Sequence, residues 1–569
     1  MTRPRAGLAV LLLLLGGCTT ATPPPQPPAS PAPPGIAAPA QTAVLTQKND
    51  PSRTGWNRYE TVLTQATVNP ARFGRRTTYP VDGAVYAQPL FLPGLVTGNG
   101  VHNTVFVATE HDSVYAFDAD VTGTAAAPLW HRSLLPAGAR PLASDSDVTC
   151  AAISPEVGIT GTPVIDPATG TMYVVATYRE GSAIRFRVHA LDVRTGQDRV
   201  PPVSIEASAR GTAQDAVDAT ITFTPRYEQQ RMGLLLLRGT VYVTFASYCD
   251  EDPSHGWILG YRAADLTRTV VYTDSPDAGT TGNRPGGGGL WESETGLTAD
   301  AAGSIYVVTG NGPFDLDSGG RDAGNSLLRL VPDGGTLRVA DWFSPFHQFC
   351  LNNHDQDLGS GGPLLLPKDN EVLFIGKGGR IFVNRLDHLG GHVHVDNPCE
   401  QNTMARVDLD QIVQELPDDT VQGGVWGSET YWSGYLYTAG ISDHLTAWRM
   451  SGGKVLTPAA SRARQELAYP GGIPVGSSNG DAPGSAILWI VSNEDAGPAL
   501  HAYDPADLSY ELYGSEQRLK RDGLYGYTNF TVPTVAAGRV FVGTRNSLVV
   551  FGPLAGPASA GPASSAVSR

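Results

Sequence analysis

The chain has 569 residues, of which 41% are hydrophobic and 17% are charged. This is enough apolar material for a large core, so the composition excludes wholesale disorder. The formal net charge of −15 gives an acidic surface, which argues against nucleic acid and anionic membrane surfaces as electrostatic partners. With 66 Gly and 44 Pro, the chain is expected to turn often and to form few long helices.

Residues 1–17 have the pattern of a lipoprotein signal peptide. Arg3 and Arg5 precede an apolar run that is too short to span a bilayer by itself. The run ends in Leu-Gly-Gly directly before Cys18, which resembles the bacterial lipobox. The resemblance implies that Cys18 becomes a lipidated N-terminus, anchored in the cell envelope and facing the periplasm or the exterior. The alternative is an ordinary signal peptide followed by an unrelated cysteine.

The two ends of the mature chain are expected to lie outside the folded core. Residues 18–48 are rich in Pro, Ala and Thr, and we expect a flexible, extended linker that holds the domain away from the membrane. Residues 556–569 are mostly small, and we expect a disordered tail. Residues 49–555 are then left to form one folded domain.

This central region repeats a pattern of short alternating strands. The clearest copy, residues 103–135, contains the strands VFVAT and VYAFDA, which a turn at His111-Asp112 separates, and a last strand with Trp130. About eight such copies follow one another, and repeats of about 40–50 residues with four strands are typical of propeller blades. The sequence therefore predicts an all-β, eight-bladed β-propeller. The last copy lacks an outer strand, and we expect residues 73–81 to supply it and close the ring. A β-sandwich is the alternative.

Besides Cys18, the chain contains Cys150, Cys249, Cys350 and Cys399. An exported protein meets an oxidising compartment, where disulfides are stable. Four cysteines permit three pairings, of which we favour Cys150–Cys249 with Cys350–Cys399. The sequence has no C-x-x-C-H motif for a covalent c-type haem and no phosphate-binding loop of the P-loop type.

One histidine pair has the spacing of metal ligands. His392 and His394 form a His-x-His motif, and residues i and i+2 of a strand share a face, so the pair could bind Zn²⁺. The surrounding sequence is typical of an exposed loop, which is the interpretation we favour.

From about Asn49 to Pro553 the chain resembles the quinoprotein alcohol dehydrogenases, which are eight-bladed propellers that bind pyrroloquinoline quinone (PQQ) and Ca²⁺. The opening NDPSRTGWNRYETVLTQATVNPARFG resembles the N-terminal lead-in of that family, and the blade repeats resemble its W-type motif. Five segments carry the more specific resemblance, in the order of the family. They are CDEDPSHGWILGY (249–261), GGGGLW (286–291), VTGNGPF (308–314), DQDLGSGGPLLL (355–366) and IGKGGRIFVNRLD (375–387).

The resemblance implies a Ca²⁺ site beside a catalytic base. It places Glu251 and Asn311 as Ca²⁺ ligands, and the neighbouring Asp250 and Asp252 are alternatives to Glu251. Asp357 is implied both as a metal ligand and as the general base that takes the proton of the alcohol. A hard cation prefers such carboxylate and amide oxygens, and a base must stay ionised to accept a proton.

The resemblance also implies residues that hold the quinone. Trp291 is expected to form an aromatic floor under it, and Lys377 is expected to contact its oxygens and stabilise the anionic reduced form. Gly359 stands where lanthanide-using members of the family have Asp, so Ca²⁺ is the expected ion. The vicinal cysteine pair that covers the quinone in the family is replaced here by Thr149-Cys150.

Two functions follow as hypotheses. The first is a lipid-anchored, PQQ- and Ca²⁺-dependent dehydrogenase that oxidises a small alcohol or sugar and passes electrons to an external acceptor, since no haem motif is present. The second is a non-catalytic PQQ-repeat propeller that acts as a protein-binding or envelope-assembly scaffold. Neither hypothesis involves nucleic acid, and both place the chain at the membrane only through its lipid anchor.

Overall fold

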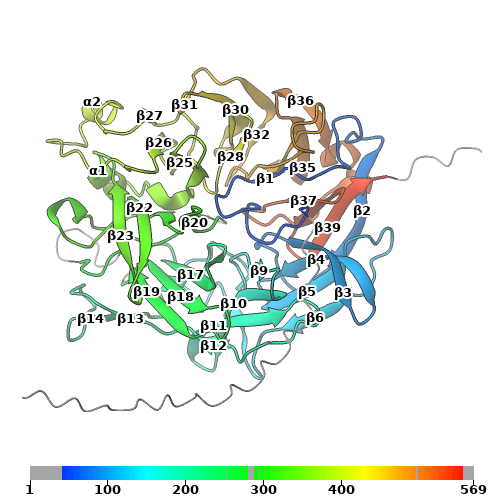
Figure 1. Ribbon diagram of the computed structural model, residues 1–569, viewed down its shortest axis with the longest axis horizontal. Coiled ribbons are helices and arrows are strands. Elements are labelled where there is room, and N and C mark those ends of the chain that lie inside the picture. The colour runs from blue at the N-terminus through cyan, green and yellow to red at the C-terminus, as the bar shows by residue number, and fades with distance from the viewer. Residues whose placement is uncertain (1–40, 252, 280–286, 294, 495–496, 555–569) are drawn as a thin grey trace, which may run out of the picture.

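The computed structural model describes residues 41–554, apart from residue 252, residues 280–286, residue 294 and residues 495–496. Within these residues, eight antiparallel blades of four or more strands stand around a common axis (Figure 1). This confirms the all-β, eight-bladed propeller predicted from the repeats. The signal peptide, Cys18, most of the linker, Asp252 and the tail 556–569 lie outside the described residues.

The blades follow one another along the chain, and each begins with its innermost strand. Blade 1 contains β3 (Leu90–Thr97), β4 (Gly100–Ala108), β5 (Ser113–Asp118) and β6 (Trp130–Ser133). Blade 2 contains β9 (Val164–Asp166), β10 (Thr171–Glu180), β11 (Ala183–Asp192) and β12 (Val203–Ser204). Blade 3 contains β16 (Leu235–Leu237), β17 (Thr240–Ser247), β18 (Trp257–Arg262) and β19 (Arg268–Thr273). Blade 4 contains β20 (Thr298–Ala299), β21 (Ile305–Val308), β22 (Leu327–Asp333) and β23 (Thr336–Phe343).

The second half of the ring has the same plan. Blade 5 contains β24 (Leu364–Leu366), β25 (Glu371–Ile375), β26 (Ile381–Arg385) and β27 (Gln414–Leu416). Blade 6 contains β28 (Thr430–Trp432), β29 (Tyr435–Thr438), β30 (Asp443–Ser451) and β32 (Ser461–Leu467). Blade 7 contains β33 (Val475–Ser477), β34 (Ile487–Glu494), β35 (Gly497–Asp504) and β36 (Asp507–Gly514). Blade 8 contains β37 (Thr534–Ala536), β38 (Arg539–Gly543), β39 (Ser547–Pro553) and β2 (Phe73–Pro80).

Short elements decorate the blades. The additional strands are β1 (Trp56–Asn57), β7 (Arg140–Ala143), β8 (Glu156–Val157), β13 (Ser208–Arg210), β14 (Thr220–Thr222), β15 (Glu228–Gln229) and β31 (Lys454–Val455). The helices are α1 (Gln348–Asn353), α2 (Gln401–Met404) and α3 (Leu519–Asp522), with 3₁₀ turns η1 (Leu316–Ser318), η2 (Leu358–Ser360) and η3 (Ser515–Arg518). No helix among the described residues has the length and hydropathy that a membrane crossing requires.

The ring closes through the N-terminal strand β2. It pairs antiparallel with β39 from Phe73 opposite Pro553 to Pro80 opposite Ser547, and Figure 1 shows the two strands side by side. A strand that precedes blade 1 therefore completes the last blade, as the sequence predicts. This pairing covers the edge of β39, to which another chain could otherwise add a strand.

Hydrophobic clusters fill the spaces between neighbouring blades. In β10, Met172 and Val174 pack with blade 1, whereas the alternate residues Tyr173 and Val175 pack with blade 3. Successive side chains of a strand point to opposite faces, so one strand serves two interfaces. This explains why the central strands are apolar at consecutive positions rather than at every second one.

The N-terminal lead-in, residues 41–57, fills the axis at one end of the ring (dark blue in Figure 1). The ammonium group of Lys48 donates to the carbonyl oxygens of Glu429 (2.9 Å) and Pro474 (2.8 Å), beside blades 6 and 7. The guanidinium of Arg53 donates to the carbonyl oxygen of Leu297 beside blade 4. Both side chains are fully buried. The packed domain thus begins inside the stretch that the sequence assigns to the linker.

Candidate active site

An ion pair between Asp357 and Lys377 lies at one end of blade 5. Asp357 directly precedes η2, and Lys377 lies in the turn after β25. The Nζ atom of Lys377 is 2.6 Å from Oδ2 of Asp357 and 3.1 Å from Oδ1 of Asp355. Burial alone would lower the pKa of Lys377, but the charges and hydrogen bonds of Asp357 and Asp355 outweigh it and raise that pKa. Lys377 is therefore a fixed positive charge at neutral pH.

Asn311 holds the other oxygen of the same carboxylate. Its backbone N–H donates to Oδ1 of Asp357 at 2.7 Å, and its side-chain Nδ2 donates to Asp355 at 2.9 Å. The amide oxygen of Asn311 accepts from Asn325, whose own amide oxygen accepts from the backbone N–H of Leu358. The two amides thus link blade 4 to the turn that carries Asp357. Since Asn311 and Asn325 are buried, this network fixes the carboxylate in position.

Trp291 approaches Asp357 across Gly310. A Cβ atom placed on Gly310 would lie 2.6 Å from Oδ1 of Asp357 and 2.7 Å from Cδ1 of Trp291. Only a residue without a side chain allows the indole and the carboxylate to come this close. The indole Nε1 of Trp291 is buried and has no hydrogen-bond partner within the described part of the chain. Such an orphaned donor beside a charged cluster is typical of a binding site.

Three carboxylates gather beside Lys377. Oxygen atoms of Asp250, Asp355 and Asp357 lie within 4.8 Å of one another. Asp357 is almost fully buried, whereas 59% of the side chain of Asp355 is exposed, so the group opens towards solvent on one side. The three like charges repel each other, and the ammonium group of Lys377 lies against two of them, Asp355 and Asp357.

Glu251 follows Asp250 in the chain, but its carboxylate is directed to Thr149 and not to this group. Its carboxylate accepts a hydrogen bond from the hydroxyl of Thr149. The adjacent disulfide between Cys150 and Cys249 joins the Thr149 segment to the loop that carries Glu251. A second disulfide joins Cys350 and Cys399, so the structure contains the pairing favoured from the sequence.

Trp426 is a neighbour of the site that the sequence reasoning missed. The Nζ atom of Lys377 lies 5.0 Å from the centre of its ring, and Tyr469 packs edge-on against it. A signal for Trp426 exists in the sequence, because GGVWGSET (423–430) repeats the pattern of GGLWESET (288–295). The same segment of two blades therefore supplies an indole to this end of the axis.

Four of the five site residues expected from the sequence lie together. The structure brings Trp291, Asn311, Asp357 and Lys377 together and puts Asp250, rather than Glu251, in the carboxylate group. The repeats predicted the blades that carry these residues. Which of two adjacent acidic residues turns inward depends on the local backbone, which has positive φ at Cys249 and Asp250. The functional roles of these residues remain predictions.

No protein-family model matches the sequence, and no curated protein matches it. Solved structures do match. Quinohemoprotein alcohol dehydrogenase ADHIIG from Pseudomonas putida HK5 is 12% identical, with a TM-score of 0.59 over 90% of this chain and 80% of that one. The quinohemoprotein alcohol dehydrogenase of Comamonas testosteroni is 15% identical, with a TM-score of 0.58 over 92% and 82%. A europium-containing methanol dehydrogenase is 12% identical, with a TM-score of 0.55 over 90% and 98%. At these identities the likeness concerns the fold, and the chain thus has the eight-bladed propeller fold of the quinoprotein dehydrogenases.

Proposed function

We propose that the chain is a quinoprotein dehydrogenase that uses PQQ and Ca²⁺ to oxidise an alcohol or a sugar. The observation that carries the proposal is the convergence of Trp291 and Lys377 on Asp357: the indole meets the carboxylate across Gly310, and Nζ of Lys377 lies 2.6 Å from its other oxygen. These are an aromatic face, a carboxylate and a fixed cation, and their segments are far apart in the sequence. Titratable groups that the fold brings together in this way are candidates for catalysis.

The donor set fits a hard divalent cation. Asp250, Asp355 and Asp357 supply carboxylate oxygens within 4.8 Å of one another. Asn311, which the sequence predicts as a ligand, turns its Nδ2 to Asp355 and its amide oxygen to Asn325, so it would have to rotate its amide to bind the ion. Ca²⁺ prefers six to eight such oxygen ligands, some of them from water. At Gly359 a Cβ atom would lie 2.6 Å from the carbonyl oxygen of Val308, so there is no room for the acidic side chain found there in lanthanide-using relatives. This supports Ca²⁺.

The aromatic and basic residues fit a flat, anionic quinone. Trp291 offers a ring and a buried N–H that lacks a partner among the described residues. Trp426 offers a second ring, and Lys377 lies between Trp426 and the carboxylates. Cys150 approaches the same region from the disulfide-bonded segment that replaces the family's vicinal pair. These residues would hold the cofactor, and the chemistry that PQQ supplies when bound is two-electron oxidation of the substrate.

In the proposed reaction Asp357 is the general base. Its carboxylate is held at Oδ1 by the Asn311 N–H and at Oδ2 by Lys377, and each oxygen keeps a lone pair that can accept the hydroxyl proton of the substrate. Lys377 keeps a positive charge at the point where negative charge develops, which stabilises the transition state electrostatically. The reduced enzyme would then pass electrons to an external acceptor in the cell envelope, where lipidated Cys18 anchors it.

The experiment is reconstitution of the purified mature protein with PQQ and Ca²⁺. We expect a shifted quinone absorption spectrum and dye reduction with small alcohols or sugars. Asp357→Asn should abolish turnover and leave quinone binding largely intact, whereas Trp291→Ala should weaken both. Asp481→Asn is the matched control, because the side chain of Asp481 is 81% exposed and far from the site in sequence. If the protein takes up no quinone, the alternative of a protein-binding scaffold gains support and the proposal fails.

A further inference from the structure

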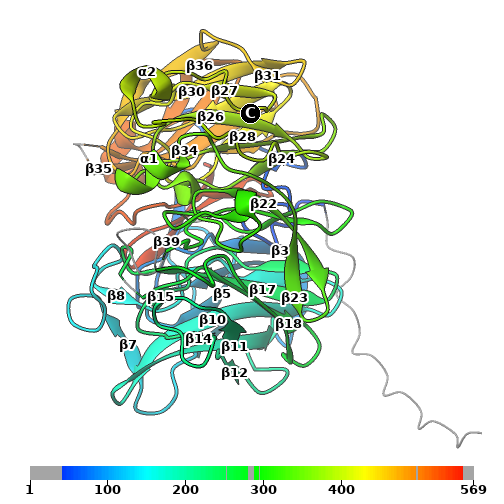
Figure 2. The same cartoon turned by 90° about the vertical axis from the view of Figure 1, so that its left-hand side faces the viewer.

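A long connection in blade 5 carries a second cluster of polar residues. Residues 386–413 join β26 to β27, whereas residues 334–335 are sufficient to join β22 to β23 in blade 4. The connection contains α2, and the Cys350–Cys399 disulfide ties it to α1. Figure 1 and the perpendicular view of Figure 2 both place α1 and α2 beside β26. Short peripheral elements of this kind bury little apolar surface and often need a covalent or metal cross-link.

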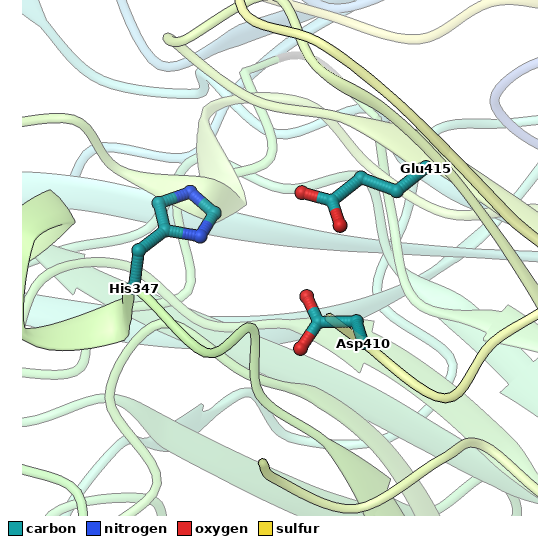
Figure 3. A group of neighbouring side chains, drawn as sticks. All are labelled: His347, Asp410 and Glu415. Carbon is teal, nitrogen blue, oxygen red and sulfur yellow. The ribbon is translucent and has the colours of Figure 1, made fainter. Parts of the chain in front are cut away.

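His347, Asp410 and Glu415 come together at the base of this connection. His347 directly precedes α1, Asp410 lies near the end of the connection, and Glu415 lies in β27. One ligand atom from each lies within 4.8 Å of the others, and all three residues are buried. Figure 3 shows the imidazole ring facing two carboxylates that are turned towards each other.

Four polar atoms of the cluster lack hydrogen-bond partners within the described part of the chain. They are both ring nitrogens of His347, Oδ2 of Asp410 and Oε2 of Glu415. The other oxygens are occupied, because Oδ1 of Asp410 accepts from the backbone N–H of Phe346 and Oε1 of Glu415 pairs with Arg380. Buried polar atoms without a partner are uncommon in proteins, so their presence here indicates a ligand. One ion could bind a single ring nitrogen of His347 together with the two carboxylate oxygens, and would thus complete three of the four atoms.

Carboxylates outnumber cations around the cluster in the described part of the chain. Arg380 is the guanidinium that faces the group, and it pairs with Glu415 and, through two nitrogens, with Asp418. The side chain of Asp418 is 36% exposed, which leaves Asp410 and Glu415 as two buried carboxylates beside one guanidinium. A buried carboxylate without a compensating charge is costly, and a bound cation would offset that cost.

We propose that His347, Asp410 and Glu415 bind a divalent transition metal ion, with Zn²⁺ as the representative of the class. Zn²⁺ takes imidazole nitrogen and carboxylate oxygen at about 2.0–2.1 Å, which places tetrahedral ligands about 3.4 Å apart. Rotation of the side chains would therefore have to close each separation by no more than about 1.4 Å, given the 4.8 Å limit.

A small cavity adjoins the imidazole on the side of Arg380. Its volume of about 10 Å³ is lined by His347, Arg380 and Asp418 among others, but by neither Asp410 nor Glu415. A larger hollow of about 490 Å³ shares Arg380 and Asp418 with it. The metal would join the start of α1 to the end of the blade 5 connection, parallel to the disulfide, and its role is structural.

The test measures metal on the purified mature protein after chelator treatment, with Zn²⁺ or Co²⁺ as the only added ion. We expect one tightly held equivalent, X-ray absorption that reports a single imidazole with oxygen ligands, and an unfolding temperature that rises with Zn²⁺ concentration. His347→Gln and Asp410→Asn should each lose this equivalent. His394→Gln, on the same connection but outside the cluster, should keep it. Asp357→Asn should also keep it, which separates this site from the proposed Ca²⁺ site.

Two outcomes would overturn the proposal. The first is a wild-type protein that holds no transition metal, which would mean that a shared proton bridges Asp410 and Glu415. The second is retention of the metal by both His347→Gln and Asp410→Asn. Since the wild-type measurements need no variant, the proposal stays testable even if both variants fail to fold.

Discussion

Adding a single methyl group at Gly310 should damage the candidate active site more than it damages the fold. The Cβ atom of Gly310→Ala would lie 2.6 Å from Oδ1 of Asp357, 2.7 Å from Cδ1 of Trp291 and 2.8 Å from the carbonyl oxygen of Gly288. Ordinary contact distances begin at about 3.4 Å, so Asp357 or its neighbours must retreat by about 0.8 Å. That shift stretches the 2.7 Å hydrogen bond from Asn311 to Asp357.

The expected consequences can be separated by assay. Overpacking of this kind costs about 1–3 kcal/mol of unfolding free energy, which urea denaturation would measure. A displacement approaching 1 Å at a catalytic group costs about 10²-fold in turnover, which dye reduction by the PQQ- and Ca²⁺-loaded protein would measure. Gly98→Ala is the matched control, because Gly98 has no neighbouring atom within 4 Å and should change neither quantity. A Gly310→Ala protein that is destabilised as expected but turns over like the wild type would refute the assignment of Asp357 and Trp291.

Three further outcomes are expected. Lys377→Met should lower turnover by about 10²–10³-fold in steady-state kinetics, because it removes a fixed charge from the site, and equal turnover would contradict the role of Lys377. Cys150→Ser should lower the free energy of unfolding by about 4–5 kcal/mol in urea titrations, as the chain-entropy model gives for a loop of about 100 residues, and should weaken Ca²⁺ binding in calorimetry. Burial raises the pKa of Glu292 from 4.5 to about 8, so the folded state keeps a proton that the unfolded chain releases. Stability should therefore fall as the pH rises from about 4.5 to about 8, and Glu292→Gln should flatten that part of the curve.

The sequence predicts the fold because each blade repeats the same physical pattern. Short strands with apolar residues at consecutive positions need a neighbour on both faces, and only a closed ring of blades supplies one to every strand. The closing strand was predictable for the same reason. The last repeat lacks one strand, and residues 73–81 form a strand that belongs to no other repeat.

The candidate site was predictable only in part. Trp291, Asn311, Asp357 and Lys377 lie at corresponding ends of their blades, so a correct fold brings them together. The inward turn of Asp250 in place of Glu251 depends on two residues with positive φ, which single-sequence reasoning does not resolve.

The metal-ligand cluster was not predictable. His347 lies 63 residues before Asp410, and no spacing motif connects them. The sequence pointed instead to the His-x-His pair at His392 and His394. His392 faces the carbonyl oxygen of Ser344 at 3.1 Å, and His394 is exposed. Only the tertiary structure brings His347 beside the buried carboxylates of Asp410 and Glu415.

The N-terminal lead-in, residues 41–57, packs into one end of the propeller axis, close to the candidate active site. Residues 426–430 run from Trp426, beside Lys377, to Thr430, whose hydroxyl oxygen accepts from Lys48 at 2.7 Å. The candidate active site is thus only a few residues along the chain from the packed lead-in. We therefore expect substrate, product and electron acceptor all to enter and leave at the opposite end of the ring, so that they would compete for the same approach.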